Sequence, residues 1–108
     1  MSEEEEEPGL DEVGEQLRTI GKRIGYARRR RGKAQREIAY YAGITRLTLS
    51  RIENGARGVA FSSYLAVLNA LQLQDMVKDF VAPERDSRGE AFGHLHQKRA
   101  YFGKNDRW

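Results

Sequence analysis

The stretch KAQREIAYYAGITRLTLSRIENG, residues 33–55, decides the fold of this 108-residue chain. It holds two short segments in which apolar residues recur at helical spacing, separated by Gly43. In the second segment Leu49 and Ile52 share one face, and the opposite face carries polar and basic side chains. This pattern predicts a helix that buries one side in a core and exposes the other.

Signals at the segment ends predict two helices joined by a tight turn. The first helix is expected over about residues 35–41, and Gly43 ends it. The second begins after Thr45, whose hydroxyl can accept a hydrogen bond from the amide of residue 47 or 48. It runs to about Glu53 and ends at the Asn-Gly pair 54–55. Two helices in this order, with a glycine in the turn, form the helix-turn-helix arrangement.

Three further helices are expected around this pair, and no segment is typical of a strand. The first helix runs over about residues 11–31. Its apolar stripe is Val13, Leu17, Ile20, Ile24 and Ala27. A fourth helix is expected after a cap at Ser62 or Ser63, and a fifth after Gln74 or Asp75. Pro83 is expected to end the fifth. The sequence therefore predicts an all-α fold.

The charge of the chain is unevenly distributed. Residues 1–12 carry seven acids and no base, whereas residues 13–60 carry twelve Lys and Arg against three acids. A segment this basic favours a polyanion as its partner, although a solvated basic surface is the alternative. The acidic run 3–7 has the composition of a disordered tail. It is either a solubilising tail or a polyanion mimic that covers the basic face.

Composition argues against several other classes of protein. The chain has no Cys, no apolar run of membrane-spanning length and no secretory signal, so we expect a soluble cytoplasmic protein without a cofactor. Glu90, His94 and His96 are a weak candidate for a metal site, and we expect neither a metal nor an enzyme. RNA binding by the basic face is a further alternative, although the chain lacks an aromatic sheet on which bases stack.

The exposed face of the second helix in the pair suits contact with DNA bases. The major groove, about 12 Å wide, admits one α-helix. The residues predicted to face it are Arg46, Leu47, Ser50 and Arg51. Arg can donate two hydrogen bonds to guanine, Ser can bond several bases, and Leu can pack on a thymine methyl.

Residues 17–73 resemble the XRE/Cro-type helix-turn-helix family of transcriptional regulators. The matching segments are IGKRI, RRRRG, QREIAYYAGIT, LSRIENG and LAVLNALQL. The resemblance implies a five-helix, lambda-repressor-like DNA-binding domain over residues 11–82. A flexible acidic tail would precede it at 1–10, and an extended C-terminal tail would follow at 83–108.

The resemblance also implies roles for individual residues. Gln35 would bind a phosphate and support the residue at 46, and Arg28 would pair with Glu53 to tie the first helix to the third. The set expected to contact DNA phosphates is Lys33, Gln35, Arg36, Thr45, Asn54 and Arg57. Two positions depart from the family pattern. Ala34 stands where Ser or Thr usually caps the second helix, and Gln72 stands where Gly usually ends the fourth.

Members of this family bind as dimers, so we expect a homodimer on a palindromic double-stranded operator, with half-sites about one helical turn apart. The candidate interface is Tyr64, Leu68, Met76 and Phe80.

The segment LNALQLQDMVKDFVAPERDSRGEAF, residues 68–92, is similar to HipB-like antitoxins. This second resemblance implies a bacterial, nucleoid-associated repressor of its own operon that also binds a HipA-like kinase toxin. The residues expected to bind that partner are Phe92, Tyr101, Phe102 and Trp108. The alternative is a stand-alone XRE-family or phage-type repressor with no toxin partner.

Overall fold

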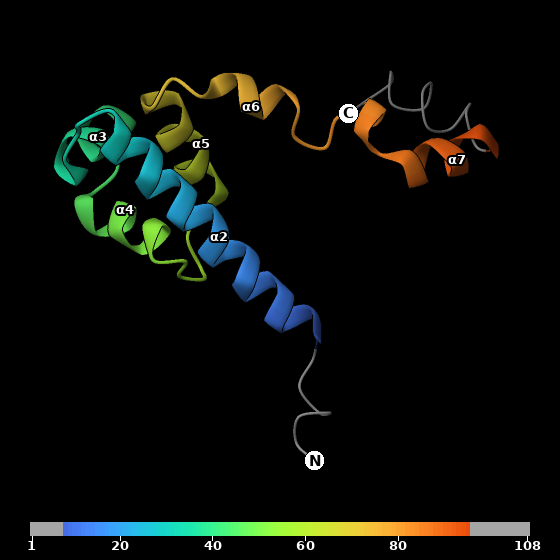
Figure 1. The fold of residues 1–108 in the computed structure, drawn as a ribbon, viewed down its shortest axis with the longest axis horizontal. Coiled ribbons are helices and arrows are strands. Elements are labelled where there is room, and N and C mark those ends of the chain that lie inside the picture. The colour runs from blue at the N-terminus through green and yellow to red at the C-terminus, as the bar shows by residue number, and fades with distance from the viewer. Residues whose placement is uncertain (1–7, 96–108) are drawn as a thin grey trace, which may run out of the picture. The chain divides into compact units, whose positions relative to one another are not determined.

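The computed structural model describes residues 8–95, which contain helices and no strand. The α-helices are α2 (Pro8–Arg30), α3 (Gln35–Ala42), α4 (Arg46–Glu53), α5 (Phe61–Ala70), α6 (Gln74–Lys78) and α7 (Ser87–Leu95), with a 3-10 helix η1 (Pro83–Arg85) before α7 (Figure 1). Contacts divide the chain into two compact units between Gln74 and Asp75. The expected all-α, lambda-repressor-like fold is confirmed.

The core of the first unit lies between α2, α3, α4 and α5. Helix α3 packs against both α4 and α5, and α2 packs against α4, as Figure 1 shows. The buried cluster is Ile24, Ile38, Ala39, Leu49, Ile52, Val67 and Leu71. Leu49 and Ile52 are fully buried, as the sequence pattern of α4 predicted. These two side chains therefore fix which face of α4 is exposed.

The packing face of α2 differs from the predicted apolar stripe. Val13 and Ile20 remain 43% and 44% exposed, whereas Gly21 and Gly25 are buried. A Cβ atom added at Gly21 would lie 2.8 Å from the carbonyl oxygen of Glu53, which is closer than atoms can pack. The glycines thus let the backbones of α2 and α4 approach each other, and the stripe prediction was wrong at positions 13 and 20.

Four helices in the first unit end in the same backbone turn, with a left-handed residue after the last helical turn. Gly32, Gly43 and Gly55 supply this residue after α2, α3 and α4, and Gln72 supplies it after α5 with φ 63°. The amide of Gln72 donates to the carbonyl of residue 69 (2.9 Å), and the next amide donates to the carbonyl of residue 68 (2.8 Å). This is the Schellman pattern. The departure from Gly at 72 therefore leaves the helix end intact but puts a side chain in a strained conformation.

The starts of α2 and α5 differ from the sequence prediction. Helix α2 begins at Pro8, three residues earlier than expected, because proline suits the first turn of a helix. Helix α5 begins at Phe61 after Ala60, which makes no side-chain cap hydrogen bond. Ser62 and Ser63 lie within the first turn of α5, so the prediction that one of them caps the helix was wrong.

The second unit contains short helices. Pro83 begins η1, and α7 packs against it. The Asp86 side chain accepts a hydrogen bond from the Gly89 amide (2.9 Å) and so caps α7, which the weak helical spacing of this segment did not predict. The compact units separate after Gln74, whereas the sequence placed residues 75–82 with the DNA-binding domain.

Candidate DNA-binding interface

Helix α4 presents a polar and basic face opposite its buried one. The Thr45 hydroxyl accepts a hydrogen bond from the Thr48 amide (3.0 Å), so it caps the helix as the sequence predicted. Arg46 and Leu47 in the first turn are exposed, and Leu47 keeps 68% of its surface in solvent. Ser50 is half-buried. An exposed leucine beside an exposed arginine is an arrangement that can meet an apolar and a polar group on the same partner.

A bidentate salt bridge links the end of α2 to the end of α4. Arg28 donates from Nε and Nη2 to the two carboxylate oxygens of Glu53, at 2.7 and 3.0 Å. The two side chains are only 11% and 9% exposed. The hydrogen bond to Glu53 raises the pKa of Arg28 above its ordinary value, although burial opposes the shift. The structure thus brings together the two residues expected to pair.

Gln35, the first residue of α3, connects this bridge to Arg46. Its Nε2 donates to Oε1 of Glu53 (3.0 Å), and its Oε1 accepts from Nη1 of Arg46 (3.1 Å). Because one partner is a carboxylate and the other a guanidinium, these two contacts fix the orientation of the Gln35 amide. The guanidinium of Arg46 is therefore held at the start of α4 by a chain of side chains that begins at Arg28.

The loop before α3 is tied to the same chain of contacts. Arg28 Nη1 donates to the carbonyl oxygen of Lys33 (2.8 Å). The Ala34 amide donates to the Glu37 carboxylate (2.8 Å), which is the Glu half of a capping box. The other half, a hydrogen bond accepted by the side chain at 34, is absent because alanine has no acceptor. Sequence reasoning found the missing cap but not Glu37, although Glu three residues after the cap position is the usual signal. Lys33 in this loop and Arg36 in the first turn of α3 are exposed.

Arg51 and Ser50 make contacts within the domain. Arg51 Nη2 donates to the carbonyl oxygen of Arg57 (2.9 Å), which ties α4 to the loop that follows it. Asn54 Nδ2 lies 3.4 Å from the Ser50 hydroxyl oxygen. Ser50 and Arg51 were predicted to contact bases beyond the first turn of α4. Both are thus hydrogen-bonded to the segment after α4 that carries Asn54 and Arg57.

The remaining predicted site residues lie elsewhere. Tyr64 and Leu68 are half-buried on α5, and Met76 and Phe80 in the second unit are 61% and 62% exposed. Phe92 on α7 is also exposed. The other residues of the predicted partner-binding set, together with His96 of the candidate metal cluster, lie outside the described residues: Tyr101, Phe102 and Trp108. Among residues 12–93, whose side chains the structure describes, no three His, Cys, Asp or Glu side chains form a metal site.

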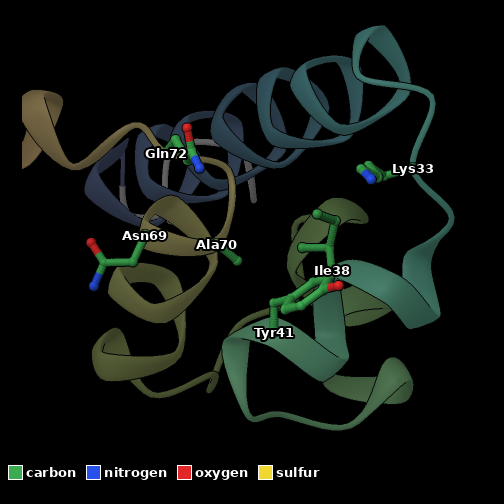
Figure 2. A pocket seen from close by; sticks show the side chains of 6 residues that line it. All are labelled: Lys33, Ile38, Tyr41, Asn69, Ala70 and Gln72. Carbon is green, nitrogen blue, oxygen red and sulfur yellow. The ribbon is translucent and has the colours of Figure 1, made fainter.

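A surface hollow of about 450 Å³ lies between α3, the end of α5 and the loop before α3. Figure 2 shows its lining side chains: Lys33, Ile38, Tyr41, Asn69, Ala70 and Gln72. Buried Ile38 forms its floor, whereas Lys33 and Tyr41 are exposed. The hollow carries one cation and no buried polar group among its lining residues, so it offers little that would hold a small molecule.

Residues 24–74 match the family model described as helix-turn-helix. These residues include the end of α2 and all of α3, α4 and α5, so the match covers the contacts described above. No curated protein and no solved structure matches the chain significantly. The chain therefore carries a helix-turn-helix domain of the XRE/Cro type, as its sequence predicted, and is a DNA-binding transcription regulator. Among the described residues, no helix is both long and apolar enough to span a membrane.

Proposed function

We propose that the chain is a sequence-specific repressor that places α4 in the major groove and contacts bases with Arg46. The observation that carries this proposal is the hydrogen bond that holds Arg46 to Gln35, which is itself held by the buried Arg28–Glu53 pair. A guanidinium positioned before binding loses less conformational freedom when it bonds a base, which favours discrimination between bases.

The base contacts follow from the chemistry of the exposed first turn. Arg46 has donors free to bond O6 and N7 of guanine in the usual bidentate geometry. Leu47, which is exposed next to it, can pack on a thymine methyl group. Ser50 would lie deeper in the groove, and Arg51 would lie at its edge. Their hydrogen bonds to the loop after α4 would hold both side chains in place instead of letting them extend.

Phosphate contacts would flank the groove on both sides. Lys33, Gln35 and Arg36 surround the start of α3, and Thr45 lies at the start of α4. Asn54 and Arg57 lie in the loop after α4, at its opposite end. Contacts of this kind orient a protein on the duplex without carrying sequence information.

Binding as a homodimer to a palindromic operator remains part of the proposal, because one α4 spans only a few base pairs. Tyr64 and Leu68 in the first unit, and Met76 and Phe80 in the second, are the candidate residues. The first two side chains are half-buried and the second two are largely exposed. Each pair therefore offers apolar surface that a second copy of the chain could cover.

The direct test is selection of duplexes from a randomised pool, followed by fluorescence anisotropy on the selected duplex and on a scrambled one. The proposal predicts at least about 1,000-fold preference for the selected duplex at physiological salt. It also predicts a selected sequence with two-fold symmetry. Equal affinity for both duplexes, with a strong salt dependence, would show a non-specific binder and would contradict the proposal.

An antitoxin role is a second candidate that rests on the sequence similarity of residues 68–92 to HipB-like proteins. Its supporting observation is the exposure of Phe92 on α7. Deletion of residues 83–108 would separate the two functions, because DNA binding would persist while binding of a kinase toxin encoded beside the gene would be lost. Retained toxin binding by the deleted chain would exclude the tail as the binding segment.

A further inference from the structure

An apolar stripe on the N-terminal half of α2 is only partly covered by its own domain. Val13 and Ile20 are 43% and 44% exposed, and Leu17 between them is half-buried. Their spacing of four and then three residues places them on one line of the helix, as in the seam of a coiled coil. Figure 1 shows that this part of α2 extends beyond the other helices of the first unit.

This arrangement favours a partner helix over a solvated surface. Apolar residues that are exposed singly are common on protein surfaces and need no explanation. Here they recur along one line, in a part of α2 that extends away from the core. Because most of the stability of a helix in a protein comes from packing of its apolar face, a second helix that covers this stripe would stabilise α2.

The charges on α2 are segregated along its length. Glu12 and Glu15 precede Leu17, whereas Lys22 and Arg23 follow it, and all four charged side chains are exposed. Neither Lys22 nor Arg23 forms an ion pair with another described residue. A second copy of α2 that runs antiparallel would place acids against bases at both ends, whereas a parallel copy would place like charges together. The helix is therefore complementary to itself in the antiparallel direction.

We propose that Val13, Leu17 and Ile20 bind α2 of a second copy of this chain, which crosses in the antiparallel direction close to Leu17. Such a contact is isologous, because both copies use the same surface about a two-fold axis. The proposed function already includes a homodimer, with candidate contacts on α5 and in the second unit. The contact through α2 is an additional one, and it does not depend on DNA binding.

Glu12 and Arg23 form the pair of residues that reports this contact. They lie about 20° apart around the axis of α2 and about 16 Å apart along it, so they cannot pair within one chain. In the antiparallel arrangement Glu12 of one copy lies beside Arg23 of the other, because the two residues are at similar distances from Leu17 in opposite directions. A charge exchange between them is therefore sensitive to the second copy alone.

Sedimentation velocity of the full chain over about 1 to 200 μM measures the association. Glu12→Arg and Arg23→Glu are each expected to weaken it about 5- to 10-fold, because each substitution creates two like-charge contacts in a symmetric dimer. The double variant should return to within about 2-fold of the wild type, since the exchanged charges again face each other.

The apolar part of the contact is tested in the same way. The double variant Val13→Gln, Ile20→Gln is expected to weaken association more than about tenfold, because it removes the apolar surface that the second copy covers. The matched control is Tyr40→Gln, Tyr41→Gln, which removes two exposed aromatic side chains from α3 and should leave association unchanged.

A local readout separates this contact from any other surface between copies. The chain has no cysteine, so one introduced thiol can join only its counterpart in a second copy. Gln16→Cys places a thiol beside the crossing point, whereas Thr19→Cys places one on an exposed part of α2 that faces away from the stripe. Mild oxidation is expected to give at least about fivefold more disulfide-linked dimer with Gln16→Cys than with Thr19→Cys, because a disulfide needs closely spaced Cα atoms.

Three results would each overturn the inference: a chain that stays monomeric over this concentration range, equal cross-linking at the two positions, or a charge-exchanged double variant that associates as weakly as the single variants. None of these measurements uses DNA. If cross-linking and charge exchange behave as expected but no duplex is selected, the proposed function alone fails. If a duplex is selected but these results are not obtained, the inference alone fails.

Discussion

Arg46 donates a 3.1 Å hydrogen bond to the side-chain oxygen of Gln35, although eleven residues separate them in the chain. The contact joins the first residue of α3 to the first residue of α4. Gln35 in turn bonds Glu53 at the other end of α4, so the geometry of the exposed first turn depends on a pair buried behind it.

Gln35→Met is expected to lower discrimination between operator sequences more than it lowers stability. Methionine keeps the length of the side chain but loses both hydrogen bonds, so Arg46 is no longer held. We expect about a tenfold loss for the selected duplex and a smaller loss for a scrambled one, measured by anisotropy. Lys33→Met is the matched control, since it removes an expected phosphate contact only and should weaken both duplexes equally.

Glu53→Gln is expected to destabilise the domain by about 2–3 kcal/mol, because it leaves the poorly exposed Arg28 guanidinium without its counter-charge. Urea unfolding followed by circular dichroism measures the change. The double variant Arg28→Met, Glu53→Met should recover most of the loss, because two apolar side chains need no partner. A double variant as unstable as Glu53→Gln would show that packing, and not the ion pair, is responsible.

Tyr64→Phe is expected to raise stability by about 1 kcal/mol, since the Tyr64 hydroxyl is buried without a hydrogen-bond partner among the described residues. Burial also raises the pKa of Tyr64 above its ordinary value near 10. The folded state therefore favours the neutral phenol. The part of the folding stability that depends on this neutral phenol is complete below pH 10 and is lost as the pH rises through the folded pKa.

Thermal unfolding between pH 8 and pH 11 measures this effect. The wild-type chain should lose more stability over the alkaline part of that range than Tyr64→Phe. Parallel profiles would show that burial does not raise the pKa of Tyr64, and a Phe variant less stable than the wild type at pH 8 would mean that the hydroxyl has a partner.

Gln72→Gly is expected to stabilise the first unit by about 1 kcal/mol, because Gln72 holds the left-handed conformation that glycines adopt after α2, α3 and α4. Gly43→Ala is the converse control. It places a Cβ atom where no other atom lies within 4 Å, so its cost of about 1 kcal/mol is conformational alone. Chemical denaturation of both variants checks the pair, and a destabilising Gln72→Gly would contradict the assignment.

The sequence predicted α4 well because every signal for it is local. Thr45 and the Asn-Gly pair define the ends of the helix, and Leu49 and Ile52 define its buried face. The pairing of Arg28 with Glu53, in contrast, joins residues 25 positions apart, and only the family resemblance indicated it. Spacing rules describe one helix at a time and contain no information on which helices meet.

The packing of α2 could not be predicted from apolar spacing. That method counts side chains, and the contact of α2 with α4 is made where side chains are absent, at Gly21 and Gly25. The start of α5 was missed for a related reason. Ser62 and Ser63 are good caps, but the chain enters the helix one residue before them, at Phe61.

The most direct test of the central claim is the affinity of Arg46→Ala for every single-base variant of the selected duplex, measured beside Arg57→Ala. The account predicts that Arg46→Ala loses preference at one position of each half-site, at a cost of about 1–3 kcal/mol, and keeps it elsewhere. Arg57→Ala should weaken all duplexes about equally. If Arg46→Ala also weakens all of them equally, α4 does not contact bases through Arg46, and the proposed recognition is wrong.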